Sequence, residues 1–166
     1  MNPEKRRSSR RVPLLLAGLA VIAAASAGCA PADRQAEVAA KGRQVMPFDL
    51  DRTMHRFTKT GTGGLQTVTA KDPADARQVQ LIREHLTEEV TRFGEGDFGD
   101  PASIHGGEMP GLRALEAGHD RIDIRYAEAP AGARITYTAS DPALVEALHA
   151  WFDAQVTDHG QHAEHG

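Results

Sequence analysis

The chain has 166 residues, one cysteine and a formal net charge of −4 at pH 7. A single cysteine excludes a disulfide within the chain and a zinc site built from several thiolates. The acidic balance argues against nucleic acid and anionic lipid as partners, and it favours cations or basic partners.

The segment 1–28 has the three-part layout of a bacterial lipoprotein signal. Basic residues gather between positions 5 and 11, and the apolar run at 14–25 is shorter than a membrane span needs. Ser26-Ala27-Gly28-Cys29 follows and resembles a lipobox, whose cysteine receives fatty acyl chains such as palmitate. We therefore expect residues 1–28 to be a signal peptide and Cys29 to anchor the protein in the cell envelope, outside the cytoplasm. An uncleaved membrane anchor is the alternative.

Three regions are predicted after the signal. Residues 29–45 are rich in alanine and charged residues without a sustained period, which favours a flexible tether that could contain a short helical piece. Residues 46–159 have the size of one domain. The polar, histidine-rich tail at 160–166 is typical of disorder.

The domain begins with a predicted β-hairpin and helix. Residues 53–60 and 65–70 alternate and are separated by a glycine-rich turn. Asp72-Pro73 is typical of a helix start, and Gly94 and Gly96 predict its end. Between them, apolar residues recur at helical spacing: Val79, Ile82, Leu86, Val90 and Phe93.

A long central stretch at 93–112 interrupts the regular pattern. It holds six glycines and two prolines, so it cannot be one continuous helix or strand. We expect short helical turns at 101–105 and after Pro110, within a long loop that is either functional or packed on itself.

The hairpin-and-helix pattern then returns in the second half of the chain. Residues 121–126 and 133–139 alternate, and Asp141-Pro142 begins a second apolar helix. Thr69-Ala70-Lys71-Asp72-Pro73-Ala74 matches Thr138-Ala139-Ser140-Asp141-Pro142-Ala143, so position 69 corresponds to position 138. The repeat predicts an α+β fold of tandem ββα units: four antiparallel strands with two main helices on one face and the long central loop between the copies.

Taken together, several short motifs resemble a family of small exported bacterial lipoproteins of unsettled function. The motifs are His55-x-Phe57, Ile82-Arg-Glu-His85-Leu86, Phe93-x-x-Gly96-Asp97-Phe98-x-x-Pro101-x-x-Ile104-His105-Gly106, Met109-Pro110-Gly111, and Ser140-Asp141-Pro142 up to Leu148-His149-x-x-Phe152. The resemblance covers about residues 46–159. Some members carry the label aspartate carbamoyltransferase. This chain lacks the Ser-Thr-Arg-Thr phosphate loop and the His-Pro-x-Gln segment of that enzyme family, so we do not expect that activity.

Four side chains are candidate ligands for a transition metal: His55, His85, His105 and Met109. Imidazole binds copper and zinc, and thioether favours Cu(I). His105 and Met109 lie at i and i+4, and His85 and His55 would join them if the central loop folds across that face. The alternative is that these histidines are hydrogen-bonded residues at the edge of the core.

Two helical pairs, His85 with Glu89 and His149 with Asp153, also lie at i and i+4. Their carboxylates could orient the imidazoles behind a metal, or the pairs could act as general bases. More often such pairs only stabilise a helix, by about 0.2–0.5 kcal/mol. We assign no catalytic residue.

These patterns leave three hypotheses of different classes. The first is a lipid-anchored, non-enzymatic binding module, with copper or zinc as the possible cofactor. The second is a structural or protein-interaction domain of the envelope that binds no metal. The third is an enzyme that uses a histidine–carboxylate pair beneath the central loop. The sequence does not set the oligomeric state.

Overall fold

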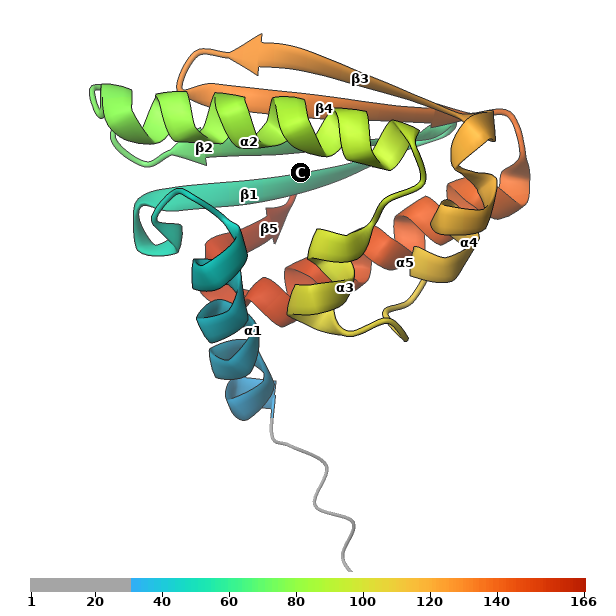
Figure 1. Ribbon diagram of the computed structural model, residues 1–166, viewed down its shortest axis with the longest axis horizontal. Coiled ribbons are helices and arrows are strands. Elements are labelled where there is room, and N and C mark those ends of the chain that lie inside the picture. Colours follow the sequence, from blue (N-terminus) through green and yellow to red (C-terminus); the bar gives the residue numbers. More distant parts are fainter. Residues whose placement is uncertain (1–30) are drawn as a thin grey trace, which may run out of the picture.

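A mixed five-stranded sheet, in the order β3-β4-β2-β1-β5, runs through the computed structural model, which describes residues 31–166 (Figure 1). The strands are β1 Thr53–Thr60, β2 Gly63–Ala70, β3 Ile122–Ala129, β4 Gly132–Ala139 and β5 Ala163–His165. The predicted signal at 1–28 and the predicted lipidation residue Cys29 lie outside the described residues. Within residues 31–166, no helix has the length and apolarity to span a bilayer.

Five α-helices complete the α+β fold: α1 Pro31–Val45, α2 Ala76–Gly94, α3 Gly99–His105, α4 Leu112–Gly118 and α5 Pro142–His159. Short 3-10 turns lie at Leu50–Arg52, His119–Arg121 and Gly160–His162. Both long helices pack on one face of the sheet, α2 mainly against β3 and β4, and α5 mainly against β1 and β2. Each long helix therefore lies over the hairpin of the other half of the chain.

Alternation along the strands sorts side chains between the two faces of the sheet. Phe57, Val68, Ile135 and Tyr137 are buried beneath the helices, whereas Arg134, next to Ile135 on β4, is exposed. One face therefore forms the core and the other meets solvent, as is common for antiparallel sheets.

The two predicted hairpins have the same register. Thr53 pairs with Ala70 in the first hairpin, and their counterparts in the repeat, Ile122 and Ala139, pair in the second. At the centre of the sheet, Gln66 pairs with Ile135, its own counterpart in the repeat. The two hairpins are therefore related by an approximate two-fold rotation between β2 and β4.

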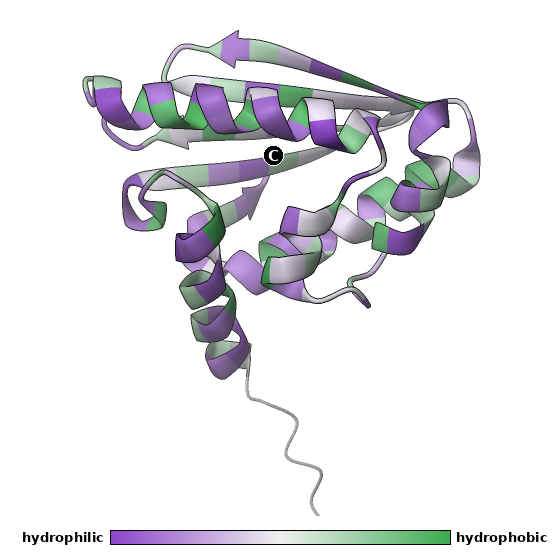
Figure 2. Cartoon of the chain, in the orientation of Figure 1, coloured by the Kyte–Doolittle hydropathy of each residue, from purple (hydrophilic) through white to green (hydrophobic). Residues whose placement is uncertain are grey.

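The helix starts differ between the halves. Asp141 caps α5 as predicted, because its side chain accepts a hydrogen bond from the amide of Ala143. The start predicted at Asp72-Pro73 is wrong, since α2 begins at Ala76 with Asp75 as its cap. Asp72 instead accepts from the amide of Ala74 in a turn before the helix. The alternation of apolar and polar residues along α2 is visible in Figure 2.

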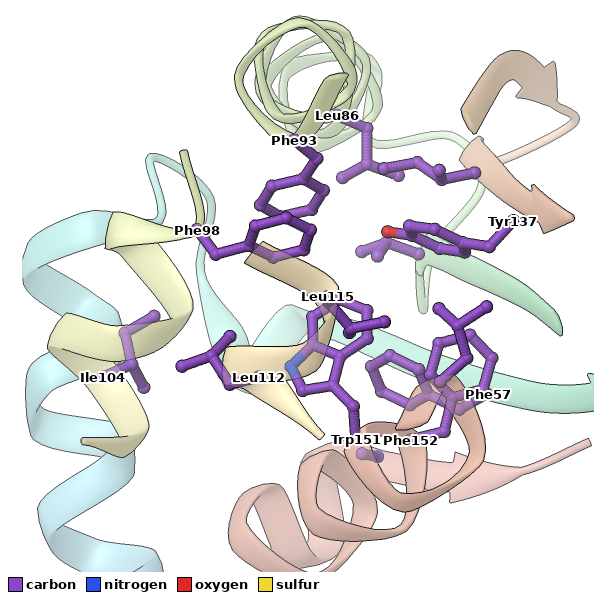
Figure 3. Close-up of a cluster of buried hydrophobic side chains, with 14 of the residues drawn as sticks. Phe57, Leu86, Phe93, Phe98, Ile104, Leu112, Leu115, Tyr137, Trp151 and Phe152 are labelled. Atoms are coloured by element: carbon purple, nitrogen blue, oxygen red, sulfur yellow. The ribbon is translucent and has the colours of Figure 1, made fainter. Parts of the chain in front are cut away.

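The central stretch folds into the two predicted short helices, α3 and α4, which bury their apolar side chains. Phe98 stacks on Phe93 of α2 with ring centroids 4.5 Å apart, and both meet the ring of Trp151 on α5 edge-on (Figure 3). Leu112 and Leu115 of α4 are fully buried beside them. The bridge between the two halves is therefore part of the core.

Three predictions about the periphery are wrong. The tether predicted at 29–45 is instead helix α1 over Pro31–Val45, whose Val38 is buried, because the helix packs against α3 and α5. The tail predicted to be disordered forms a 3-10 turn and β5. Because β5 runs parallel to β1, the sheet is mixed and five-stranded, and not four-stranded and antiparallel.

Gly111 is a glycine at which a side chain would be poorly tolerated. Its φ is 80°, and an added Cβ would overlap the carbonyl oxygen of Ala147 on α5. We expect Gly111→Ala to lower the free energy of unfolding by about 3 kcal/mol, through left-handed strain and overpacking. Gly107→Ala is the control, because no atom lies within 4 Å of its added Cβ. Urea denaturation of both variants tests this, and equal loss in both would contradict it.

Candidate functional site

The inner face of β1 and helices α2, α3 and α5 enclose a cavity of about 40 Å³. We call it the histidine cavity and define it by five lining residues: His55, His85, Glu89, His105 and His159. A water molecule needs roughly 10–15 Å³ measured in this way. The histidine cavity therefore has room for a few waters or for one ion bound directly by side chains.

Three imidazoles from three elements meet on one side of the histidine cavity. His55 of β1 and His159 at the end of α5 lie parallel, with ring centroids 5.2 Å apart and 4° between their planes. His105 at the end of α3 meets His159 edge-on at 4.9 Å. His55 faces inward because it alternates with exposed Arg56, and His159 because it lies two helical turns after buried Phe152.

Burial keeps these imidazoles neutral at pH 7. It lowers the pKa of His55 to about 4, partly opposed by a hydrogen bond with the backbone of His162. Burial, followed by the nearby His55 and His105, holds the pKa of His159 well below its usual value. Burial also lowers the pKa of His85. Neutral imidazoles keep a nitrogen lone pair, which is the form that binds metals.

The imidazole of His105 is hydrogen-bonded to the carboxylate of Asp158. Its Nδ1 lies 2.8 Å from Oδ2 of Asp158, while Arg34 of α1 contacts the same Oδ2 at 2.7 Å and donates to the His105 carbonyl oxygen at 2.6 Å. Burial lowers the pKa of His105, and Asp158 opposes that shift. The pKa of the Asp158 carboxyl is itself lowered, because hydrogen bonds from Arg34 and His105 outweigh its partial burial. The ionised Asp158 thus accepts a hydrogen bond from Nδ1–H of His105 and fixes that tautomer.

Glu89 of α2, which also lines the histidine cavity, is a buried acid. Burial first, and then Asp100 through its charge and a hydrogen bond, raise the pKa of Glu89 to about 8. Arg92 opposes the shift at 3.7 Å from Glu89 and ion-pairs with Asp100 at 2.5 Å. Glu89 therefore carries a proton at pH 7 and is hydrogen-bonded to Asp100.

Several buried polar atoms around the histidine cavity have no hydrogen-bond partner within the described part of the chain. They are Nδ1 of His55, Nδ1 of His159, Oε1 of Glu89 and Nε1 of Trp151. Leaving such a group unsatisfied costs about 1–3 kcal/mol. The four residues line the same small space, where an internal water or a bound ion would satisfy these polar atoms.

The structure brings together four of the seven residues singled out in the sequence: His55, His85, Glu89 and His105. Met109 is buried but lines a different hollow, with Pro110, Ala150 and Ala154 on the far side of His105. The prediction that Met109 joins His55 and His85 in one site therefore fails, although His105 lines both spaces. The chain turns between His105 and Met109 at Gly106, where φ is 91°.

The second helical pair lies away from the histidine cavity. Nε2 of His149 contacts the carbonyl oxygens of Thr60 and Gly63 at 3.0 and 2.9 Å, where it ties α5 to the first hairpin. Asp153 pairs with Lys59 at 2.5 Å, so it does not orient His149. The pairing predicted for His149 and Asp153 is wrong.

Sequence reasoning missed five polar residues that line or support the site: Gln66, Asp100, Gln155, Asp158 and His159. His159 was assigned to the domain boundary, next to a tail expected to be disordered. The signal was present, because His159 continues the buried stripe of α5, two helical turns beyond Phe152 and Trp151. Asp158 is recognisable only from the contact between the last turn of α5 and α3.

The fold and the site define a small α+β domain built around a buried, histidine-lined cavity. Among residues 31–166, no three His, Cys, Asp or Glu side chains already stand in a metal-binding arrangement. No protein family, curated protein or solved structure matches the chain.

Proposed function

We propose that this protein is a lipid-anchored, extracytoplasmic binding module that takes a copper or zinc ion into the histidine cavity. The observation that carries the proposal is the meeting of neutral His55, His105 and His159 in one small space, two of them with unpartnered nitrogens. Imidazole is the commonest protein ligand of both metals. Asp158 would support His105 from behind, as carboxylates commonly do for metal-bound histidines.

The volume of the histidine cavity favours an ion over an organic molecule as its ligand. Sites for drug-sized molecules are clefts of about 300–1,000 Å³, whereas the histidine cavity holds about 40 Å³. The rings of His55 and His159 lie stacked, so binding requires them to rotate about their side-chain bonds until their nitrogens converge. Met109 is not in this ligand set, because it lines the other hollow.

The test is metal content after loading with Cu²⁺ or Zn²⁺ and gel filtration. We expect one equivalent for the wild type and at least tenfold weaker binding for His159→Phe, which keeps the ring stack on His55 and removes both nitrogens. His165→Gln, at an exposed tail histidine, is the control and should bind as the wild type does. Equal binding by all three proteins contradicts the proposal, and no binding by any of them favours the structural domain instead.

An acid–base enzyme is the second candidate, favoured by the Asp158–His105 pair. His105 and Asp158 also line the outer hollow of about 670 Å³ beside Met109, which is wide enough for an organic substrate. A general base contributes typically about 10²–10⁴-fold to a rate. His105→Asn should then abolish hydrolysis of an activated ester such as p-nitrophenyl acetate, whereas the exposed-site variant His165→Gln should not.

The proposed lipid anchor outside the cytoplasm depends on Cys29. Cys29→Ser should move the protein from the membrane fraction to the soluble extracytoplasmic fraction, because the acyl chains would be its anchor. Immunoblots of fractionated cells measure this. Retention of the variant in the membrane would favour the uncleaved anchor.

We also propose that the two ββα units arose by duplication of one unit. The equal hairpin registers and the Gln66–Ile135 pairing at the centre support this. The central bridge and β5 would then be later additions, since they have no counterpart in the other half of the described chain.

A further inference from the structure

The two outer edges of the sheet differ. The edge of β1 is occupied by β5, which pairs alongside His55, Arg56 and Phe57. The equivalent edge, on β3, pairs with no strand among residues 31–166 and lies open along one border of the sheet (Figure 1). β3 spans Ile122–Ala129, and an exposed edge of this length presents unpaired backbone donors and acceptors to any strand of matching sequence.

The segment Ile122–Tyr126 of β3 is complementary to itself when two copies run antiparallel. With Ile124 opposite Ile124 of a second copy, Asp123 falls opposite Arg125 and Arg125 opposite Asp123. Ile122 falls opposite Tyr126. Within this segment the charged residues alternate with the apolar ones, so Asp123 and Arg125 meet on the solvated face and the apolar side chains on the helix-covered face.

Within one chain, Asp123 and Arg125 pair with each other. Nε of Arg125 lies 2.7 Å from Oδ2 of Asp123, and both side chains are largely exposed. On the occupied edge, by contrast, Arg56 pairs across strands with Glu164 of β5, at 2.8 Å between Nε and Oε1. Arg125 is the counterpart of Arg56 in the repeat. An arginine at this position thus already holds an acidic residue of a neighbouring strand in one half of the fold.

A shallow hollow of about 560 Å³ also lies along this edge, between Tyr126 and Glu128 of β3 and the outer side of α2. Tyr126 is only partly buried there. Ile122 of a second copy would come beside Tyr126 and cover it. Glu84 and Glu88 border the same hollow on α2 and are acidic, so the contact would centre on the strands and not on the helices.

We propose that the protein forms a two-fold symmetric dimer through antiparallel pairing of β3 with β3 of a second copy. The two five-stranded sheets then join into one continuous sheet. The interface is isologous, with two Asp123–Arg125 pairs related by the axis and Ile124 on the axis. Cross-strand pairs of opposite charge stabilise sheets, and like charges directly opposite destabilise them.

Sedimentation equilibrium over a concentration series tests the proposal through charge reversal. The wild type should be a dimer. Arg125→Asp and Asp123→Arg should each weaken dimerisation by about tenfold or more, because both cross-strand pairs become repulsive. Mixing the two variants should yield a heterodimer in which both pairs are attractive again. The double exchange Asp123→Arg with Arg125→Asp should restore the homodimer.

The mixed sample guards against variants that merely fail to fold, because unfolded chains would not recover on mixing. A wild type that stays monomeric at every concentration overturns the proposal. Dimers that persist unchanged in both single variants overturn it too, because the interface would then lie elsewhere on the surface.

Discussion

Glu89→Gln should stabilise the folded domain at pH 8 by about 4 kcal/mol relative to the wild type. The pKa of Glu89 is about 8 in the folded protein, against an ordinary value of 4.5. The folded state therefore keeps a proton that the unfolded chain releases, and stability is lost as the pH rises from 4.5 through 8. Glutamine is neutral at every pH and can still donate a hydrogen bond to Asp100, so it avoids this loss.

Urea unfolding at several pH values between 5 and 8 measures the effect. The difference between Glu89→Gln and the wild type should grow with pH and be small at pH 5. Glu88→Gln, at an exposed carboxylate on the same helix, is the control and should change stability little at any pH. A Glu89→Gln protein that is destabilised equally at both ends of the range would show that Glu89 is ionised and paired in the folded state.

The histidine cavity should make the domain sensitive to acid. The pKa of His55 is about 4 when folded, against an ordinary 6.5, so the unfolded chain binds its proton first as the pH falls. The contribution of neutral His55 to the free energy of unfolding is fully present above pH 6.5. It falls by about 3 kcal/mol as the pH drops to 4. Burial lowers the pKa of His159, His85 and His105 in the same direction. Against a typical total of about 5–15 kcal/mol, acidification to pH 4 should unfold much of the protein.

Circular dichroism during acid titration follows this transition. His159→Phe should shift the midpoint to lower pH, because one buried base is gone and no unpaired nitrogen remains in its place. His165→Gln should leave the midpoint unchanged. A wild type whose unfolding free energy stays flat from pH 7 to pH 4 would mean that the histidine cavity opens to water without loss of the fold.

The hairpins, the long helices and the repeat were predictable from the sequence because their signals are local. Alternation in 53–60 and 133–139 and the apolar stripe from Val79 to Phe93 fix both the element and the face that it buries. The same alternation puts His55 on the face of Phe57, and the helical period puts His85 on the flank of the apolar stripe. The short helices of the bridge followed from the positions of its prolines and glycines.

The remaining features depend on contacts between distant segments. The short strand β5, Ala163–His165, has no strand pattern of its own, and its order comes from the edge of β1. Helix α1 has few apolar residues, and it is held by packing on α5 and by the contact of Arg34 with Asp158. His159 belongs to the site because the end of α5 lies beside β1 and α3, a contact that no local sequence pattern indicates. Met109 lies outside the histidine cavity because Gly106 turns the chain after His105.

The most direct test of the histidine cavity as a metal site is anomalous diffraction from crystals of the zinc-loaded protein. We predict one anomalous peak inside the histidine cavity, within bonding distance of nitrogens of His55, His105 and His159. A peak confined to His165 and other surface residues, with the histidine cavity holding only water in protein shown to carry zinc, would contradict the account.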